Sequence, residues 1–218
     1  MIERFRIRSA SPEVIKLLLE YGAKTEKRTT TSSGYGPSAL TVLLNHHGFE
    51  KELSEESIGT KFDTTGGRSR RVWLKCVEAL IQGGARWETA LILRNGGTQL
   101  TQLFAFFPPS PSDVAKYIHL VRDAIDAGFN LMAEDGDGRI PLFTLCERMA
   151  STVQSHCPES PKILEAVMKM HGRSNVGIAD KSGMTVMDIP DRVEKSCLAL
   201  CRSILADMIM GSFNYDTS

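Results

Sequence analysis

The sequence Val77-Glu78-Ala79-Leu80-Ile81-Gln82-Gly83-Gly84-Ala85 is an apolar helical pattern that ends on glycine. The same offsets recur at residues 15–23 and 121–129, so that all three copies read V/I-x-x-(L/A)-(L/I)-x-x-G. Apolar side chains at i, i+3 and i+4 share one helix face, and glycine adopts the left-handed conformation that closes a helix without a Cβ penalty. We therefore predict three helices, each followed by a glycine stop.

A second pattern lies between these copies. It reads G-x-(S/T/I)-x-(L/M) and occurs at residues 36–40, 96–100, 138–142 and 183–187. A glycine turn followed by a hydroxyl N-cap, or by proline at the first helical position, is typical of a helix start. We therefore predict a first helix at each of these sites, preceding a second helix.

The resulting unit of turn, first helix, second helix and glycine stop resembles the ankyrin repeat, which has a T-P-L-H motif on the first of its paired helices. The resemblance covers about residues 12–209. The place of the motif histidine holds Thr41, Thr101, Phe143 and Asp188. The resemblance implies an all-α fold, an ankyrin-like helical repeat solenoid.

The resemblance also implies one domain over residues 1–218. It divides into a half repeat at 12–23, repeats at about 36–85, 96–129, 138–172 and 183–209, and an insertion at 48–71. The motif glycines lie 60, 42 and 45 residues apart, against a family period of about 33, which is why insertions are expected. Because the half repeat lacks most of its first helix, the chain is interpreted either as part of a longer array or as a scaffold whose N-terminal face meets another chain.

Composition excludes several classes of function. Lys plus Arg and Asp plus Glu both total 26, so no bulk charge favours nucleic acid or an acidic partner. Five cysteines scattered through apparent helices indicate a reducing compartment rather than a disulfide framework. No apolar stretch reaches the roughly 20 residues that a membrane span needs. We predict an intracellular protein of the cytoplasm or nucleus, with no membrane partner.

The motifs for catalysis and metal binding are incomplete. Residues 135–139 superficially resemble a calcium loop, but Arg139 stands at the third ligand place and Cys146 at the twelfth, so a turn is favoured. Cys197 and Cys201 lack the further ligands that a zinc site needs. No G-x-S-x-G turn or phosphate-binding glycine motif is present. We predict no enzymatic activity, no cofactor and no metal.

Arg68, Arg70 and Arg71 form the densest positive charge in the sequence. Contact with phosphate, contact with an acidic protein and a targeting signal remain possible interpretations. Base-stacking aromatics are not interleaved there, apart from Trp73 on the apolar pattern of its helix. A solvated edge of the insertion is favoured, and nucleic acid is not the expected partner.

The predicted function is a protein–protein interaction module that binds a partner protein, of unknown identity, on its concave face. The alternative is a structural spacer, or a fragment of a larger ankyrin-repeat protein, that acts through its ends. The resemblance implies contact positions at the turn tips and late in the first helices: Tyr35, Asn45, His46, Arg94, Asn95, Phe106, Asp137, Arg139, Glu147, Arg148, Lys181, Met184 and Arg192.

Phe106 and Tyr35 are the preferred anchors among these contact positions, because aromatic residues and arginines dominate measured interface energies. Phe106 belongs to the run Leu103-Phe104-Ala105-Phe106-Phe107, which cannot all face inward on one helix. The contact positions also carry charges of both signs. We therefore expect a partner whose own surface is mixed in charge.

Overall fold

The computed structural model describes residues 11–26, 30–31, 34–35, 37–44, 64–88, 97–107, 111–171 and 177–213. The chain divides into two compact units, Met1–Glu88 and Thr89–Ser218, each of which is described by itself. The regular elements of the described residues are helices, joined by turns and loops, and one antiparallel pair of two-residue strands, β1 (Thr30–Thr31) and β2 (Gly34–Tyr35). The all-α prediction is therefore confirmed for this part of the chain. None of its helices is both long and apolar enough to cross a membrane.

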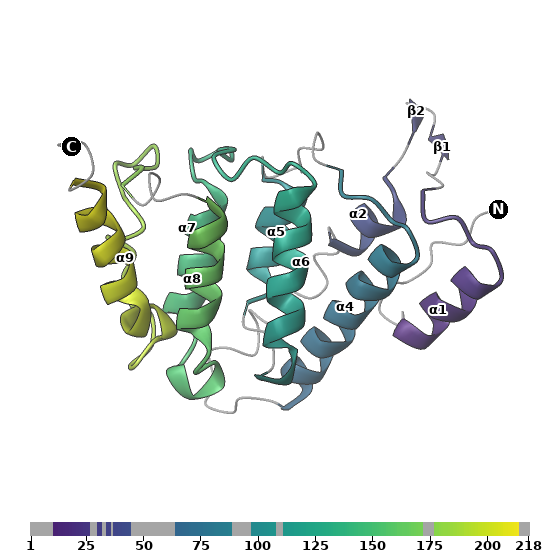
Figure 1. The fold of residues 1–218 in the computed structure, drawn as a ribbon, viewed down its shortest axis with the longest axis horizontal. Helices are drawn as coiled ribbons and strands as arrows, with labels where there is room; N and C mark the ends of the chain where they lie inside the picture. Colours follow the sequence, from purple (N-terminus) through teal and green to yellow (C-terminus); the bar gives the residue numbers. More distant parts are fainter. Residues whose placement is uncertain are drawn as a thin grey trace. The chain divides into compact units, whose positions relative to one another are not determined.

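The first unit contains α1 (Pro12–Glu20), α2 (Ala39–Leu44) and α4 (Thr64–Gln82) (Figure 1). Both α1 and α2 pack against α4. Trp73 on α4 is almost completely buried, and its indole N–H donates to the carbonyl oxygen of Leu43 on α2 at 3.3 Å. The core of this unit thus lies between α2 and α4.

Helix α4 begins at Thr64 and therefore includes residues 64–71 of the predicted insertion. Gly66 and Gly67 lie inside this helix, although each glycine costs a helix interior about 1 kcal/mol relative to alanine. The sequence prediction placed the two glycines in the insertion at 48–71 rather than in this helix. Intrinsic propensity is a weak guide to a helix boundary, because tertiary context overrides it.

The second unit contains five α-helices and two short 3-10 helices in its described part. These are α5 (Gln99–Ala105), η2 (Pro111–Asp113), α6 (Val114–Asp126), α7 (Pro141–Ala150), η3 (Gln154–His156), α8 (Ser160–His171) and α9 (Cys197–Phe213). Helix α5 packs against α7, α6 packs against α8, and α9 packs against both α7 and α8 (Figure 1). The helices predicted as first and second members of each repeat thus form two adjacent rows.

The three predicted glycine stops are confirmed. Gly22, Gly84 and Gly128 have φ values of 82°, 90° and 97°. At each one, the glycine N–H bonds to the carbonyl oxygen three residues earlier, and the next N–H bonds to the carbonyl oxygen five residues before itself. These two bonds define the Schellman motif, which satisfies carbonyl groups that the helix leaves free.

Two of the predicted helix starts are confirmed in detail. Thr98 is the N-cap of α5 and exchanges bonds with Thr101, so a hydroxyl pair forms the capping box. Pro141 is the first residue of α7, where its missing N–H costs nothing. The motif at residues 36–40 leads into α2, which begins at Ala39, and Ser38 likewise bonds with Thr41.

The fourth predicted start is wrong, because no first helix follows Gly183. Residues 186–188 form only a turn, in which Asp188 accepts bonds from the backbone N–H and the hydroxyl of Thr185. Pro190 lacks an N–H and forces the residue before it out of the helical region, so a helix cannot continue past this turn. The last predicted repeat, 183–209, therefore contributes a turn and α9.

Candidate functional site

Two loops of the second unit have the same backbone structure. We call residues 135–139 and 180–184 the finger pair. In each finger the leading aspartate accepts bonds from the N–H groups two and four residues later, at 2.8 to 3.0 Å. The aspartate N–H also bonds to the carbonyl oxygen of the fifth residue, and its carbonyl oxygen accepts from the glycine N–H. The spacing D-x-x-G-x therefore produces the same closed turn twice.

The two fingers lie directly against each other. The Lys181 backbone N–H donates to the carbonyl oxygen of Asp137 at 3.1 Å, and the Lys181 ammonium donates to the carbonyl oxygen of Gly136 at 2.8 Å. A Cβ on Gly138 would lie 3.2 Å from the Lys181 backbone nitrogen. Glycine at this position therefore permits both the turn and the close approach of the second finger.

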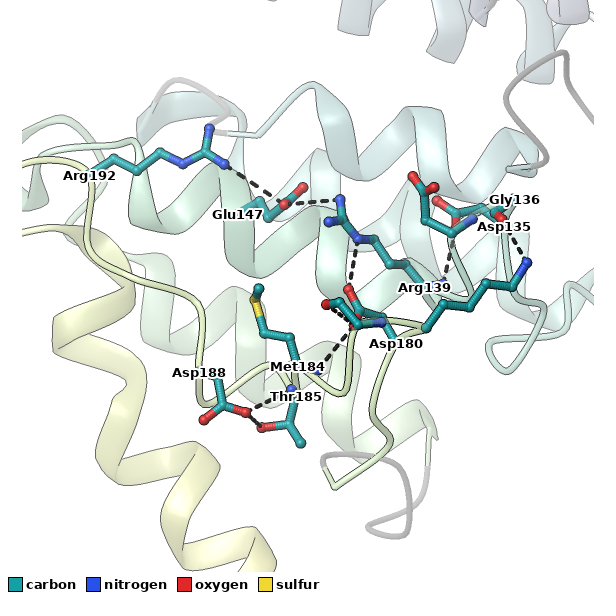
Figure 2. A network of polar contacts seen from close by, with 12 residues as sticks. Asp135, Gly136, Arg139, Glu147, Asp180, Met184, Thr185, Asp188 and Arg192 are labelled. Atoms are coloured by element: carbon teal, nitrogen blue, oxygen red, sulfur yellow. Dashed lines mark hydrogen bonds and ion pairs between the residues drawn. The ribbon is translucent and has the colours of Figure 1, made fainter.

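Arg139 connects the fingers to α7 (Figure 2). Its Nε atom donates to Asp180 Oδ2 at 3.2 Å, and its Nη1 atom donates to Glu147 Oε1 at 3.3 Å. The Arg192 guanidinium approaches the same Glu147 oxygen at 3.8 Å. One carboxylate from α7 and one from the second finger thus share the charge of a single arginine.

Asp180 is the most enclosed member of this network, with its side chain 2% exposed. The Ser182 hydroxyl, the N–H groups of Met184 and Ser182, and the Arg139 guanidinium all donate to it. The Ser182 bond is the largest influence, and together these donors lower the pKa of Asp180 to about 2 despite the opposing effect of burial. The carboxylate is therefore ionised throughout the physiological range.

Six of the predicted contact residues meet in the finger pair and its surroundings: Asp137, Arg139, Glu147, Lys181, Met184 and Arg192. The side chains of Arg139 and Glu147 are about two thirds enclosed and bonded to each other. These two side chains thus stabilise the position of the fingers. Asp137, Lys181 and Arg192 are the more exposed members and are available to a ligand.

Arg148 and Phe106 do not belong to this network. Arg148 is half-buried on α7. Burial raises the pKa of the Tyr117 phenol on α6, and the positive charge of Arg148 opposes this increase. Phe106 is the half-buried C-cap of α5. Phe104 and Phe107 are completely buried. The expectation that the aromatic run cannot all face inward is therefore confirmed, with Phe106 on its outer side.

The remaining predicted contact residues receive little or no structural description. Asn45, His46, Arg94 and Asn95 lie outside the described residues. Tyr35 lies in β2, where only its backbone is described, paired with Thr30. These five positions stay predictions.

The predicted contact residues did not include Asp135 and Asp180, the two aspartates that hold the fingers in shape. Both precede the motif glycine by three positions, and this shared spacing is the signal from which their matching turns could be recognised. The contact between Arg139 and Asp180 joins residues 41 apart in the sequence. No local pattern predicts a contact of that kind.

The cysteines of this chain are arranged for packing rather than for reaction. All five are free and buried. Burial raises the pKa of the Cys76 and Cys201 thiols to about 11 and that of Cys157 to about 12. A thiol becomes a nucleophile or a metal ligand as its thiolate, and burial in apolar surroundings suppresses that form. Within the described ranges, no group of three or more His, Cys, Asp or Glu side chains is placed to hold a metal ion.

A scan against protein-family models and a search of the curated proteins both found no match to this chain.

Proposed function

We propose that the chain is a divergent ankyrin-like repeat scaffold that binds a partner protein through the finger pair and the adjoining surface of α7. Three features support the repeat solenoid: the matching Schellman stops, the matching fingers, and the packing of α5 on α7 and α6 on α8. In such a scaffold each repeat buries its apolar face only against its neighbours, which leaves the turn tips for recognition.

The observation that carries the proposal is the rigid connection between the two fingers. Lys181 bonds one finger to the other through its backbone and its side chain, and Arg139 connects both to α7. Fixed loops lose little conformational entropy when a ligand binds, so a given set of contacts yields more affinity. The finger pair is therefore a part of the described surface that is prepared for binding.

The exposed groups define the chemistry of the partner. Asp137, Lys181 and Arg192 present charges of both signs on the finger pair and beside it, and the second finger also carries half-buried Met184. A uniformly acidic or basic ligand would meet a like charge here, which costs binding energy. We infer a folded protein or peptide with charges of both signs and an apolar residue for Met184.

The direct test is a pair of charge-reversed variants with equal net charge. The face variant carries Asp137→Lys and Arg192→Glu, and the control carries Asp126→Lys and Lys169→Glu on α6 and α8. Arg192 and Lys169 are well matched, because both are mostly exposed and each has a weak ion pair near 4 Å. Partners captured by the wild-type chain should bind the face variant at least about 10-fold more weakly, and the control unchanged.

Equal loss in both variants, with unchanged circular dichroism, would place the partner elsewhere and contradict the proposal. Two observations favour a binding function over an enzymatic one. The thiols are buried, and Arg139 is engaged in holding the fingers through Asp180. A scaffold of this kind, with five free cysteines, fits a reducing intracellular compartment.

A second candidate function, a structural segment that acts through its ends, is favoured by one observation. Helix α1 exposes apolar side chains that a finished repeat would cover.

A further inference from the structure

The two fingers carry different residues at one equivalent position. Asp137 is the third residue of the first finger, Ser182 is the third residue of the second, and both are exposed. Their backbone N–H groups make the same bond, to the leading aspartate of their own finger, at 2.9 Å and 2.8 Å. The residues that follow them, Gly138 and Gly183, have φ values of 77° and 83°. The two side chains therefore start from matching backbone positions.

The bond between the fingers fixes these two positions relative to each other. The carbonyl oxygen of Asp137 accepts from the N–H of Lys181, and Ser182 follows Lys181 in the chain. Each position thus lies at the contact between the fingers or one residue away from it. A partner that spans this contact therefore meets both side chains at a fixed spacing.

Ser182 has only acceptor capacity left for a partner. A serine hydroxyl has one proton to donate and two lone pairs with which to accept. The Ser182 proton is donated to Asp180 Oδ1 at 2.5 Å, so the hydroxyl oxygen is left to accept. Asp137 also offers only acceptors, because a carboxylate has no proton to donate. The two positions therefore differ in charge, whereas both of them require a donor from the partner.

We propose, building on the binding function above, that Asp137 and Ser182 determine which partner the finger pair accepts. The partner places an arginine or lysine against Asp137 and a neutral N–H or O–H donor against Ser182. Charge-assisted hydrogen bonds are about twice as strong as neutral ones, so a cation gains more opposite the carboxylate than opposite the hydroxyl. Ser182, which is not among the predicted contact residues, thereby becomes a residue that determines specificity.

An exchange of the two residues tests this assignment. The swap variant carries Asp137→Ser and Ser182→Asp, so its composition and net charge equal those of the wild type. Both fingers should keep their turns, because each new residue type already occupies the equivalent place in the other finger. The protein that the wild-type chain captures from lysate, once purified, should bind the swap variant at least about 10-fold more weakly, since its cation then faces a neutral oxygen.

The matched control is Asp126→Ser with Ser203→Asp, which exchanges the same residue types between exposed positions on α6 and α9. This control should bind as the wild type does. Biolayer interferometry at about 50 mM and about 300 mM sodium chloride measures the affinities, because salt screens charge pairs more than neutral bonds. Asp137→Asn should make binding less sensitive to salt. Ser182→Ala should weaken binding without changing that sensitivity.

The outcomes separate this assignment from the binding function on which it rests. A swap variant that binds as the wild type does, while Asp137→Lys with Arg192→Glu binds weakly, leaves the partner on the finger pair and overturns the roles of Asp137 and Ser182. Unchanged binding by both variants contradicts the binding function as well. If the swap lowers the urea midpoint, the single variants decide, and an Asp137→Asn chain with the affinity and salt dependence of the wild type overturns the assignment.

Discussion

Arg139 connects three segments that are distant in the sequence: the first finger, the second finger and α7. Its two carboxylate partners differ in environment, because Asp180 is buried and Glu147 is about one third exposed. An arginine suits this position, since its planar fork directs several N–H donors at once, whereas a lysine supplies one point charge. Arg139→Lys is therefore not a conservative change here.

Replacing Gly138 with alanine should destabilise the second unit by about 1–2 kcal/mol. The residue has a φ of 77°, which costs a side-chain-bearing residue that much, and a Cβ would also crowd the Lys181 nitrogen. Gly177→Ala is the control, because Gly177 is exposed and its Cβ would meet nothing within 4 Å. Urea unfolding followed by circular dichroism measures both variants. Equal midpoints for the two would show that the finger is not held as described.

Asp180 should give the protein a specific sensitivity to acid. Its pKa is about 2 in the folded chain, against an ordinary value of 3.8, so the ionised form stabilises the fold above about pH 4. This contribution is lost as the pH falls from about 4 to 2, because the carboxylate then binds a proton. Urea midpoints at pH 5 and pH 2.5 should therefore fall further for the wild type than for Asp180→Asn. An equal fall in both proteins would refute the role of Asp180.

At the scale of the element, α5 shows how one side of a helix packs into the core while another side stays partly in solvent. Helix α5 buries Leu100, Leu103 and Phe104 completely, and Phe107 follows it into the core. Phe106, at its C-terminal end, is half-buried. The inner side of α5 therefore contributes to stability, while Phe106 is left partly accessible to solvent.

Phe104→Ala and Phe106→Ala should differ strongly in their cost to stability. Truncating a fully buried phenylalanine costs about 3–5 kcal/mol, because it leaves a cavity in addition to the lost transfer energy. Phe106→Ala should cost less than half of that, since its side chain is already partly in water. Differential scanning calorimetry of the two variants beside the wild type provides the comparison. Similar losses would mean that Phe106 is a core residue and unsuitable as a partner anchor.

The elements differ in how far the sequence could predict them. Glycine stops and hydroxyl caps are local chemistry, so Gly22, Gly128 and Thr98 fulfil the roles that their patterns indicate. The start of α4 depends on tertiary contacts, and these cannot be predicted from the helix propensities of the residues around it. The missing first helix after Gly183 was signalled by Pro190, whose effect on the preceding residues outweighs the helix-start motif.

The candidate site was predictable in its position but not in its internal bonding. The resemblance placed Arg139 and Lys181 at turn tips and Arg192 late in a first helix, and the structure connects all three to the finger pair or to Glu147 on α7. That Arg139 would be held by Asp180 and Glu147 depends on how the second finger packs against the first finger and α7. Such long-range contacts determine which charged residues hold the fold and which remain for a ligand.

At the scale of the whole molecule, the balance of charge has a consequence for solubility. Twenty-six basic and 26 acidic side chains give a formal net charge of zero and an isoelectric point of about 7.0. Proteins without net charge lack mutual repulsion and associate more readily. Solubility in polyethylene glycol should therefore be lowest near pH 7 and rise toward pH 5 and pH 9. A solubility that changes in one direction across this range would contradict the expectation.

Hydrogen–deuterium exchange of the wild-type chain, alone and saturated with a captured partner, is the most direct test of the proposed binding face. The two fingers and the first turns of α7 should exchange more slowly in the complex. The exchange rates of α6 and α8 should be unchanged. Protection confined to α6 and α8, with the fingers exchanging as in the free chain, would contradict the account.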